Sequence, residues 1–216
     1  MSESRRKLLG LTRFDGEACE RPARVRGPNA DYFPNVALTT HERRQSLFYD
    51  DLLAGGRTVL IHCTSIAQEA VYPVLGNLAA AQPHLGARLG RDVFFYSLAV
   101  DPADTPEALA DLARRCGAGP GWLFLAGEAA DVELLRGRLF AHNGPHPVGP
   151  HGHGVKDCSV GLARYGNESI GLWGACPARA NPLWIARRLS WVVPRGAEDA
   201  AAAPRRGGPH PHTYRS

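Results

Sequence analysis

Thiol and imidazole side chains are the groups in this chain with the clearest capacity for chemistry, since they bind soft metals and exchange disulfides. The cysteines are widely spaced, at Cys19, Cys63, Cys116, Cys158 and Cys176. Their odd number argues against a disulfide framework, and no Cys-x-x-Cys pair exists for zinc or dithiol chemistry. Reduced and mostly buried thiols are therefore the default expectation.

The hydrophobic pattern predicts alternating strands and helices that could position these groups. Apolar runs predict strands, and amphipathic stretches predict helices. The strands are expected over 58–62, 93–100 and 122–126, and the helices over 68–81, 105–117 and 129–140. A hairpin is expected before them, at 36–38 and 46–48. A second hairpin around Tyr165-Gly166-Asn167 and a last helix from Asn181 to about Leu189 follow them.

This element order fits a thioredoxin-like fold but also leaves flavodoxin-like folds open. Short motifs distinguish the two. The most specific are Ser97 to Glu107 (SLAVDPADTPE) and Pro120 to Gly127 (PGWLFLAG), and the others are Phe33-Pro34-Asn35, Phe48 to Leu52, Thr58 to Pro73 and Lys156 to Ser159. In order and spacing they resemble the Sco/SenC family of thioredoxin-like copper-handling proteins, over about residues 32–190.

The resemblance implies an α/β fold with a central mixed sheet flanked by helices and an N-terminal β-hairpin. Within it, Asp101 and Asp104 are expected to stabilise the loop and the helix start. The family binds copper through Cys-x-x-x-Cys-Pro and the histidine of Asp-His-Ser. Here the matching positions hold Gln68, Tyr72 and Cys158.

An amide and a phenol are poor ligands for Cu(I), and disulfide exchange requires a second sulfur. The chain is therefore interpreted as a degenerate relative, lacking the two motif cysteines and the motif histidine. Neither copper transfer nor dithiol reduction then follows from the resemblance.

A relocated site is the alternative. In a thioredoxin-like sheet, Cys63 and Cys158 both fall at the end where the family site lies. With His62 or His153 they could bind Cu(I) or zinc, and alone they could form a disulfide or supply one reactive thiol. Otherwise Cys63 is a small core residue and Cys158 fills the space of a histidine, which we favour because unpaired cysteine is commonly buried.

Two classes of function remain. The first is a Sco-like accessory protein without dithiol activity, which binds a protein partner in the maturation of a copper or redox protein, as in cytochrome oxidase assembly. The second is a copper-binding or single-thiol redox protein that uses Cys63 and Cys158. Loss of the motif cysteines favours the first, so the prediction leans away from an enzyme. No cofactor is expected unless a relocated site exists, and such a site could bind copper.

Charge and length set the organisation. One folded domain is expected over 31–194, with disordered basic segments over 1–30 and 195–216. The folded part carries 14 basic and 15 acidic side chains, which does not predict a nucleic-acid partner. The apolar runs are too short for a transmembrane helix.

The compartment stays open, because Ser4-Arg5-Arg6-Lys7-Leu8-Leu9 resembles a twin-arginine start without its apolar region. As written, this start fits the cytoplasm, whereas members of the resembled family are usually in the cell envelope. The partner's identity and the oligomeric state cannot be predicted from the sequence.

Overall fold

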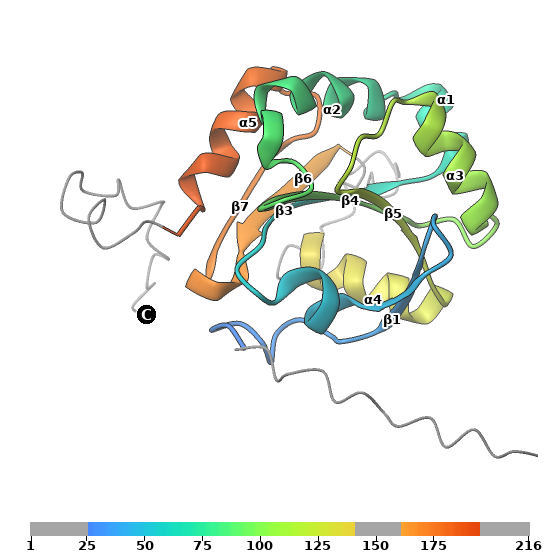
Figure 1. The fold of residues 1–216 in the computed structure, drawn as a ribbon. Coiled ribbons are helices and arrows are strands. Elements are labelled where there is room, and N and C mark those ends of the chain that lie inside the picture. Colours follow the sequence, from blue (N-terminus) through green and yellow to red (C-terminus); the bar gives the residue numbers. More distant parts are fainter. Residues whose placement is uncertain (1–25, 141–160, 195–216) are drawn as a thin grey trace, which may run out of the picture.

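The computed structural model describes residues 26–140 and 161–194, which form a mixed sheet between two layers of helices (Figure 1). The strand order is β2-β1-β5-β4-β3-β6-β7. The strands are β1 (Ala37–Thr40), β2 (Gln45–Leu47), β3 (Thr58–Thr64), β4 (Val93–Ala99), β5 (Trp122–Ala126), β6 (Leu162–Asn167) and β7 (Leu172–Pro177). The central strands β3, β4 and β5 are parallel, while β1 and β6 join them antiparallel. The predicted thioredoxin-like mixed sheet with an N-terminal hairpin is confirmed.

Each face of the sheet has its own hydrophobic core. On one face lie α2 (Leu75–Ala81), α3 (Pro106–Arg115) and α5 (Pro182–Trp191), and on the other lie α4 (Ala129–Phe140) and the π-helical turn η1 (Phe48–Leu53). The shorter elements are α1 (Ile66–Val71), η2 (Gln82–His84), η3 (Gly86–Arg88) and η4 (Glu168–Ile170). Because both faces are covered, every residue of β3 is buried, which explains its continuous apolar sequence.

The start of α3 shows how local sequence fixes an element. The Thr105 hydroxyl accepts a hydrogen bond from the Ala108 N–H at 3.3 Å, and Pro106 occupies the first helical position. Gly117, with a φ of 71°, follows the helix end. Both boundaries agree with those predicted from the sequence.

Two predicted elements differ from the structure. The single helix expected over 68–81 is two helices, α1 and α2, separated at Pro73. The turn of the C-terminal hairpin was predicted at Tyr165-Gly166-Asn167, but these residues belong to β6, and the chain turns after them at η4. Gly171, with a φ of 63°, then supplies the left-handed residue that leads into β7.

Residues 26–30 pack against the domain. The fully buried Glu168 carboxylate accepts hydrogen bonds from the Asn29 N–H at 2.7 Å and from the Trp173 indole at 2.9 Å. The Gly27 N–H donates to the Tyr49 hydroxyl at 2.7 Å. These contacts connect the beginning of the described chain to β7 and η1.

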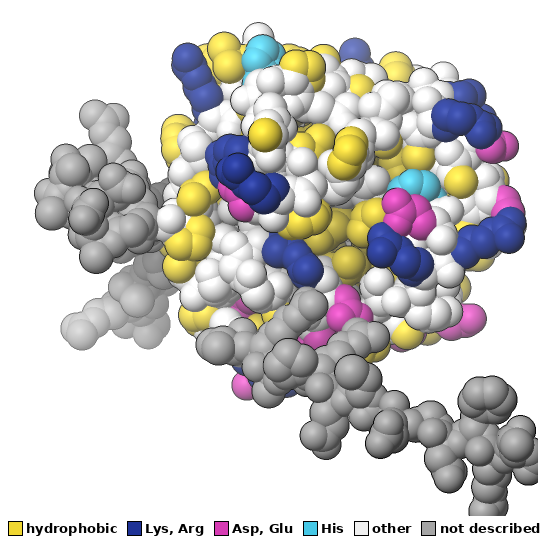
Figure 2. All heavy atoms as spheres, viewed as in Figure 1, with side chains coloured by type: hydrophobic (Ala, Val, Ile, Leu, Met, Phe, Trp, Pro, Cys, Tyr) yellow, Lys and Arg dark blue, Asp and Glu magenta, His cyan; other side chains and the backbone are white. Residues whose placement is uncertain are grey.

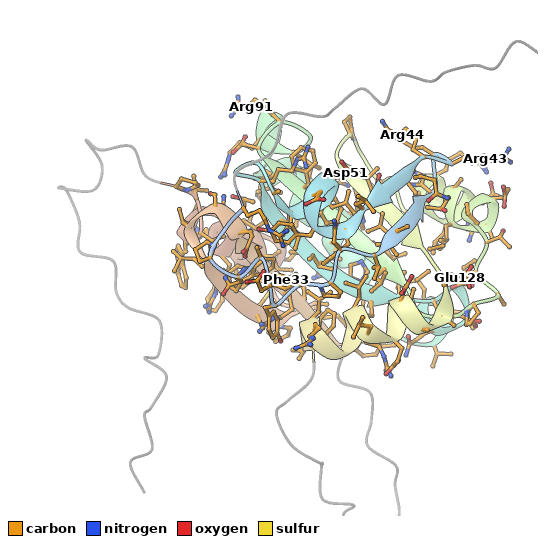
Figure 3. All side chains as sticks on the ribbon, turned by 90° about the horizontal axis from the view of Figure 1, so that it is seen from below. Phe33, Arg43, Arg44, Asp51, Arg91 and Glu128 are labelled. Atoms are coloured by element: carbon orange, nitrogen blue, oxygen red, sulfur yellow. The ribbon has the colours of Figure 1, made fainter. Side chains whose placement is uncertain are left out.

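The surface carries mixed charge. Basic side chains on the face in Figure 2 are spread out, and acidic side chains lie beside several of them. Arg43 and Arg44 extend from the tip of the β1–β2 hairpin (Figure 3), where Arg43 pairs with Glu107 of α3 at 3.1 Å. Within residues 26–140 and 161–194, no helix has the length and apolar composition needed to cross a membrane.

Candidate functional site

The candidate site is the segment from Ser65 to Leu75, which follows β3 and contains α1. The Ser65 hydroxyl caps α1 by accepting a hydrogen bond from the Gln68 N–H at 3.1 Å. The Asp104 carboxylate accepts from the Ile66 N–H at 3.0 Å. Two side chains therefore fix the first turn of α1, and one of them comes from the loop between β4 and α3.

Glu69 holds the other end of the segment. One of its carboxylate oxygens accepts hydrogen bonds from the Val74 and Leu75 N–H groups, both at 2.8 Å. Burial raises the pKa of Glu69, while these two N–H groups oppose that shift by favouring the carboxylate. A carboxylate thus caps α2 across the break at Pro73.

Gln68 and Tyr72 border a shallow surface recess, to which Cys63, Glu69 and Val74 also contribute. Tyr72 is 40% exposed. The Arg179 guanidinium lies 4.9 Å from the centre of the Tyr72 ring, which orients the ring by a cation–π contact. The recess therefore presents an amide, a phenol and one hydrogen-bonded carboxylate, with the almost fully buried Cys63 thiol beneath them.

Cys63 and His62 are neighbours on β3 but belong to opposite faces of the sheet, because side chains alternate along a strand. Cys63 is only 1% exposed and packs in the core on the α4 side. His62 is fully buried on the side of α2 and α5. The structure therefore does not bring the Cys63 thiol and the His62 imidazole together.

Both ring nitrogens of His62 have hydrogen-bond partners. Nε2 lies 2.7 Å from the Ser97 hydroxyl, and Nδ1 lies 3.1 Å from the Cys63 carbonyl. The Trp122 indole donates to the same hydroxyl at 2.8 Å. The only arrangement that satisfies every group runs from Trp122 N–H to Ser97, from Ser97 O–H to Nε2, and from Nδ1–H to the carbonyl.

This arrangement requires a neutral imidazole. Complete burial lowers the pKa of His62 to about 4, although the Cys63 carbonyl favours the protonated form. With one nitrogen donating and the other accepting, neither is left to coordinate a metal in this conformation.

The remaining thiols of the described chain are poor nucleophiles. The Cys116 thiol donates to the Ala113 carbonyl at 3.3 Å, and burial raises its pKa. Burial also raises the pKa of Cys176, with a smaller opposing effect from Arg188. Both shifts disfavour the reactive thiolate.

Two of the predicted site residues, Cys158 and His153, lie outside the described residues. Among residues 26–140 and 161–194, no three or more His, Cys, Asp or Glu side chains are grouped as a metal site would require. Within those ranges the structure brings together Gln68 and Tyr72 at the recess.

Sequence reasoning missed the roles of Glu69, Ser97 and Trp122. The break at Pro73 is a signal for Glu69, because a new helix start leaves N–H groups that need an acceptor. Ser97 and Trp122 show no local signal, since their partner His62 lies on another strand. The sequence predicted that Asp101 and Asp104 stabilise the loop and the helix that starts at Thr105. In the structure Asp101 accepts from the Ala103 N–H at 2.9 Å within that loop, whereas the Asp104 carboxylate binds the start of α1 instead.

Several solved structures share this arrangement of strands and helices. Copper-bound ScoI of Bradyrhizobium japonicum is 18% identical, with a TM-score of 0.54 over 73% of this chain and 96% of that chain. Yeast Sco1 is 16% identical, with a TM-score of 0.53 over 71% and 92% of the two chains. A SCO1/SenC family lipoprotein of Bacillus anthracis is 16% identical, with a TM-score of 0.53 over 74% and 94%.

The chain therefore has a Sco/SenC-like thioredoxin fold, as the sequence motifs predicted. No family model and no curated protein matches the sequence.

Proposed function

We propose that this Sco/SenC-like chain is an accessory protein without dithiol redox activity, which binds a protein partner during maturation of a copper or redox protein. The carrying observation is the segment after β3, where Gln68 and Tyr72 stand at the positions matched to the family's cysteines. Ser65, Glu69 and Asp104 hold this segment in place by hydrogen bonds to its backbone. Such a segment offers a fixed surface, which includes the exposed side chains of Val71 and Tyr72, instead of a pair of thiolates.

Copper chemistry supports the proposal by contrast. Solved neighbours include ScoI and Sco1 proteins with copper bound. A soft Cu(I) ion prefers a pair of thiolates, whereas the described residues of this recess offer an amide, a phenol, a carboxylate and the single thiol of Cys63, which is only 1% exposed. The partner would be a copper protein or a redox assembly factor, with cytochrome oxidase assembly as the process that the resemblance implies.

The metal half of the proposal is tested by Cu(I) binding to the reduced full chain, measured by native mass spectrometry with a competing chelator. We expect no retained copper in the unmodified protein. We expect copper in a Gln68→Cys/Tyr72→Cys variant, which restores the thiol pair at the start and end of α1. A Gln68→Cys variant alone is the matched control, because it adds one thiol without a pair.

The opposite result would support the alternative function. Stoichiometric copper in the unmodified protein, lost in both Cys63→Ser and Cys158→Ser but kept in Cys116→Ser, would establish a relocated site. Cys116 is the control because its thiol bonds to the Ala113 carbonyl in the helix that precedes it.

The accessory half is tested in cells that lack the chain. We expect the activity of a copper oxidase to fall, and a Cys63→Ser/Cys158→Ser variant to restore it as well as the unmodified chain does. An unchanged oxidase would contradict the accessory role. Rescue by the unmodified chain alone would instead assign the role to the thiols.

A further inference from the structure

The outer face of α5 exposes large aromatic side chains. The helix packs on the sheet and on α2 through buried residues that include Ile185 and Leu189. On its other side, Trp184 is 61% exposed, Trp191 is 60% exposed, and Arg187 lies between them. Figure 1 shows α5 at the edge of the molecule, with no other described element outside it.

The spacing of these side chains gives a continuous face. Trp184, Arg187 and Trp191 are three and four residues apart, which places them on one side of a helix. Seven residues of helix separate the two indoles by about 10 Å along the axis. The face is therefore a convex ridge, with an aromatic side chain near each end and a cation in the middle.

The charged side chains of α5 have one sign. The helix α5 contains Arg187 and Arg188 and no Asp or Glu, and the neighbouring α2 also lacks acidic side chains. Arg179, which precedes α5, packs on the Tyr72 ring at the recess. Within residues 26–140 and 161–194, none of the three arginines forms an ion pair. The Arg188 guanidinium lies 4.5 Å from the centre of the Trp191 ring, so cation and indole form one unit.

We propose that this ridge docks the protein on an anionic lipid surface. Indoles favour the region between headgroups and acyl chains, where an apolar ring and a polar N–H are both accommodated. Arg187 and Arg188 beside them would bind lipid phosphates, and the absence of carboxylates from α5 limits repulsion from an anionic surface. The ridge and the recess at Gln68 and Tyr72 are formed by different residues. Binding of the ridge to lipid therefore does not require the partner binding proposed for the recess.

Charge complementarity favours a lipid surface over two other occupants of the ridge, a second copy of the chain and the C-terminal segment 195–216. A second copy would oppose one basic ridge to another, and residues 195–216 carry a net charge of +2 that the same arginines would repel. An anionic surface satisfies both the indoles and the arginines.

The test is co-sedimentation of the full chain with vesicles of phosphatidylcholine and phosphatidylglycerol, compared with vesicles of phosphatidylcholine alone. We expect binding to the anionic vesicles at physiological ionic strength. Trp184→Ser/Trp191→Ser should weaken it by at least roughly tenfold, because two apolar rings no longer insert. Arg187→Gln should weaken it by about fivefold through the loss of one cation.

Matched controls separate the ridge from other surfaces. Leu134→Ser removes an exposed apolar side chain from α4, and Arg114→Gln removes an exposed cation from α3. Both should bind as the unmodified chain does. Anionic binding that survives the double tryptophan change would overturn the proposal and assign the attraction to the basic segments 1–30 and 195–216. No binding to either vesicle would also overturn it, and an acidic protein would then be the occupant to test.

Discussion

At the scale of single residues, His62 has the side chain of a metal ligand but a structural role in this fold. His62 is the histidine nearest to the site in sequence. Its side chain, however, lies on the opposite face of the sheet from Cys63, where it forms a hydrogen-bond network with Ser97 and Trp122. A buried polar group is stable only when its hydrogen bonds are satisfied. The network therefore explains how β3 can carry a histidine among apolar residues.

Removing the central hydroxyl tests this network. Ser97→Ala should lower the free energy of unfolding by about 2 kcal/mol, because the Trp122 N–H and His62 Nε2 lose their shared partner. Urea denaturation measures the loss. Ser190→Ala, at an exposed position of α5, removes the same atom and should change stability by less than about 0.5 kcal/mol. Equal losses in the two variants would count against the network.

The protonation of His62 makes stability depend on pH. Its pKa is about 4 in the folded protein against an ordinary value of 6.5, so below pH 6.5 the unfolded chain binds a proton that the folded chain excludes. Stability should therefore be complete above pH 6.5 and decline as the pH falls toward 4, by about 3 kcal/mol in total. Denaturation curves across this range would measure the decline.

A substitution identifies the group responsible. His62→Leu should lose most of this pH dependence, whatever its stability at neutral pH. Burial also lowers the pKa of the half-buried His41, so His41→Gln serves as the control and should keep most of the decline. A His62→Leu variant with an unchanged slope would show that other groups cause it.

At the scale of elements, the division of one expected helix into α1 and α2 shapes the candidate site. Hydrophobic spacing continues through residues 68–81 and predicted one helix, yet Pro73 cannot donate a hydrogen bond and restricts Tyr72 before it. Tyr72 leaves the helical region, with a φ of −133° and a ψ of 80°. Glu69 then accepts the N–H groups that the second start exposes.

Loss of the Glu69 cap should loosen α2 locally. Glu69→Ala should cost about 1 kcal/mol and speed amide exchange at Val74 and Leu75, while Glu69→Gln, which keeps an acceptor oxygen, should cost less. Hydrogen exchange measured residue by residue would show the effect. Glu133→Ala, on the exposed side of α4, should leave those amides unchanged. Unchanged exchange in Glu69→Ala would contradict the capping role.

The C-terminal hairpin shows a second limit of element prediction. Tyr165-Gly166-Asn167 has a turn-like composition, but tertiary contacts keep it extended. The Asn167 amide donates to the Gly56 carbonyl at 2.9 Å, and a Cβ on Gly166 would lie 2.3 Å from the Trp173 ring. Gly166 lacks a Cβ and so allows β7 to approach β6 closely. Contacts between residues this far apart in the chain cannot be recognised from the local sequence.

At the scale of the whole molecule, the sequence predicted the architecture better than the site. Buried strands and capped helices follow from local patterns, as at Thr58 to Thr64 and at Thr105, and short motifs were enough to suggest the thioredoxin-like topology. The site depends on which side chains meet across the sheet. Alternation along β3 separates Cys63 from His62, and the Ser97 contact depends on the register between β3 and β4.

The contacts of residues 26–30 give a prediction about the folded unit. A chain that begins at residue 26 keeps the contacts of Gly27 and Asn29. A chain that begins at residue 31 loses the hydrogen bonds from Asn29 to Glu168 and from Gly27 to Tyr49. Its free energy of unfolding should therefore be lower by about 2 kcal/mol or more.

Thermal or urea denaturation of the two shortened chains would compare them directly. Equal stabilities would place the beginning of the folded unit at residue 31, as the sequence predicts. A loss confined to the shorter chain would move that boundary toward residue 26.

The hydrogen-bond chain through His62, Ser97 and Trp122 also has a consequence for inheritance. Replacement of any one of the three leaves a polar partner unsatisfied in a dry interior, whereas three apolar residues of suitable volume could replace them all. Single changes would therefore pass through a less stable intermediate. In a lineage of related sequences, these three positions should be gained and lost as a set, and a gene with only one of them should be rare.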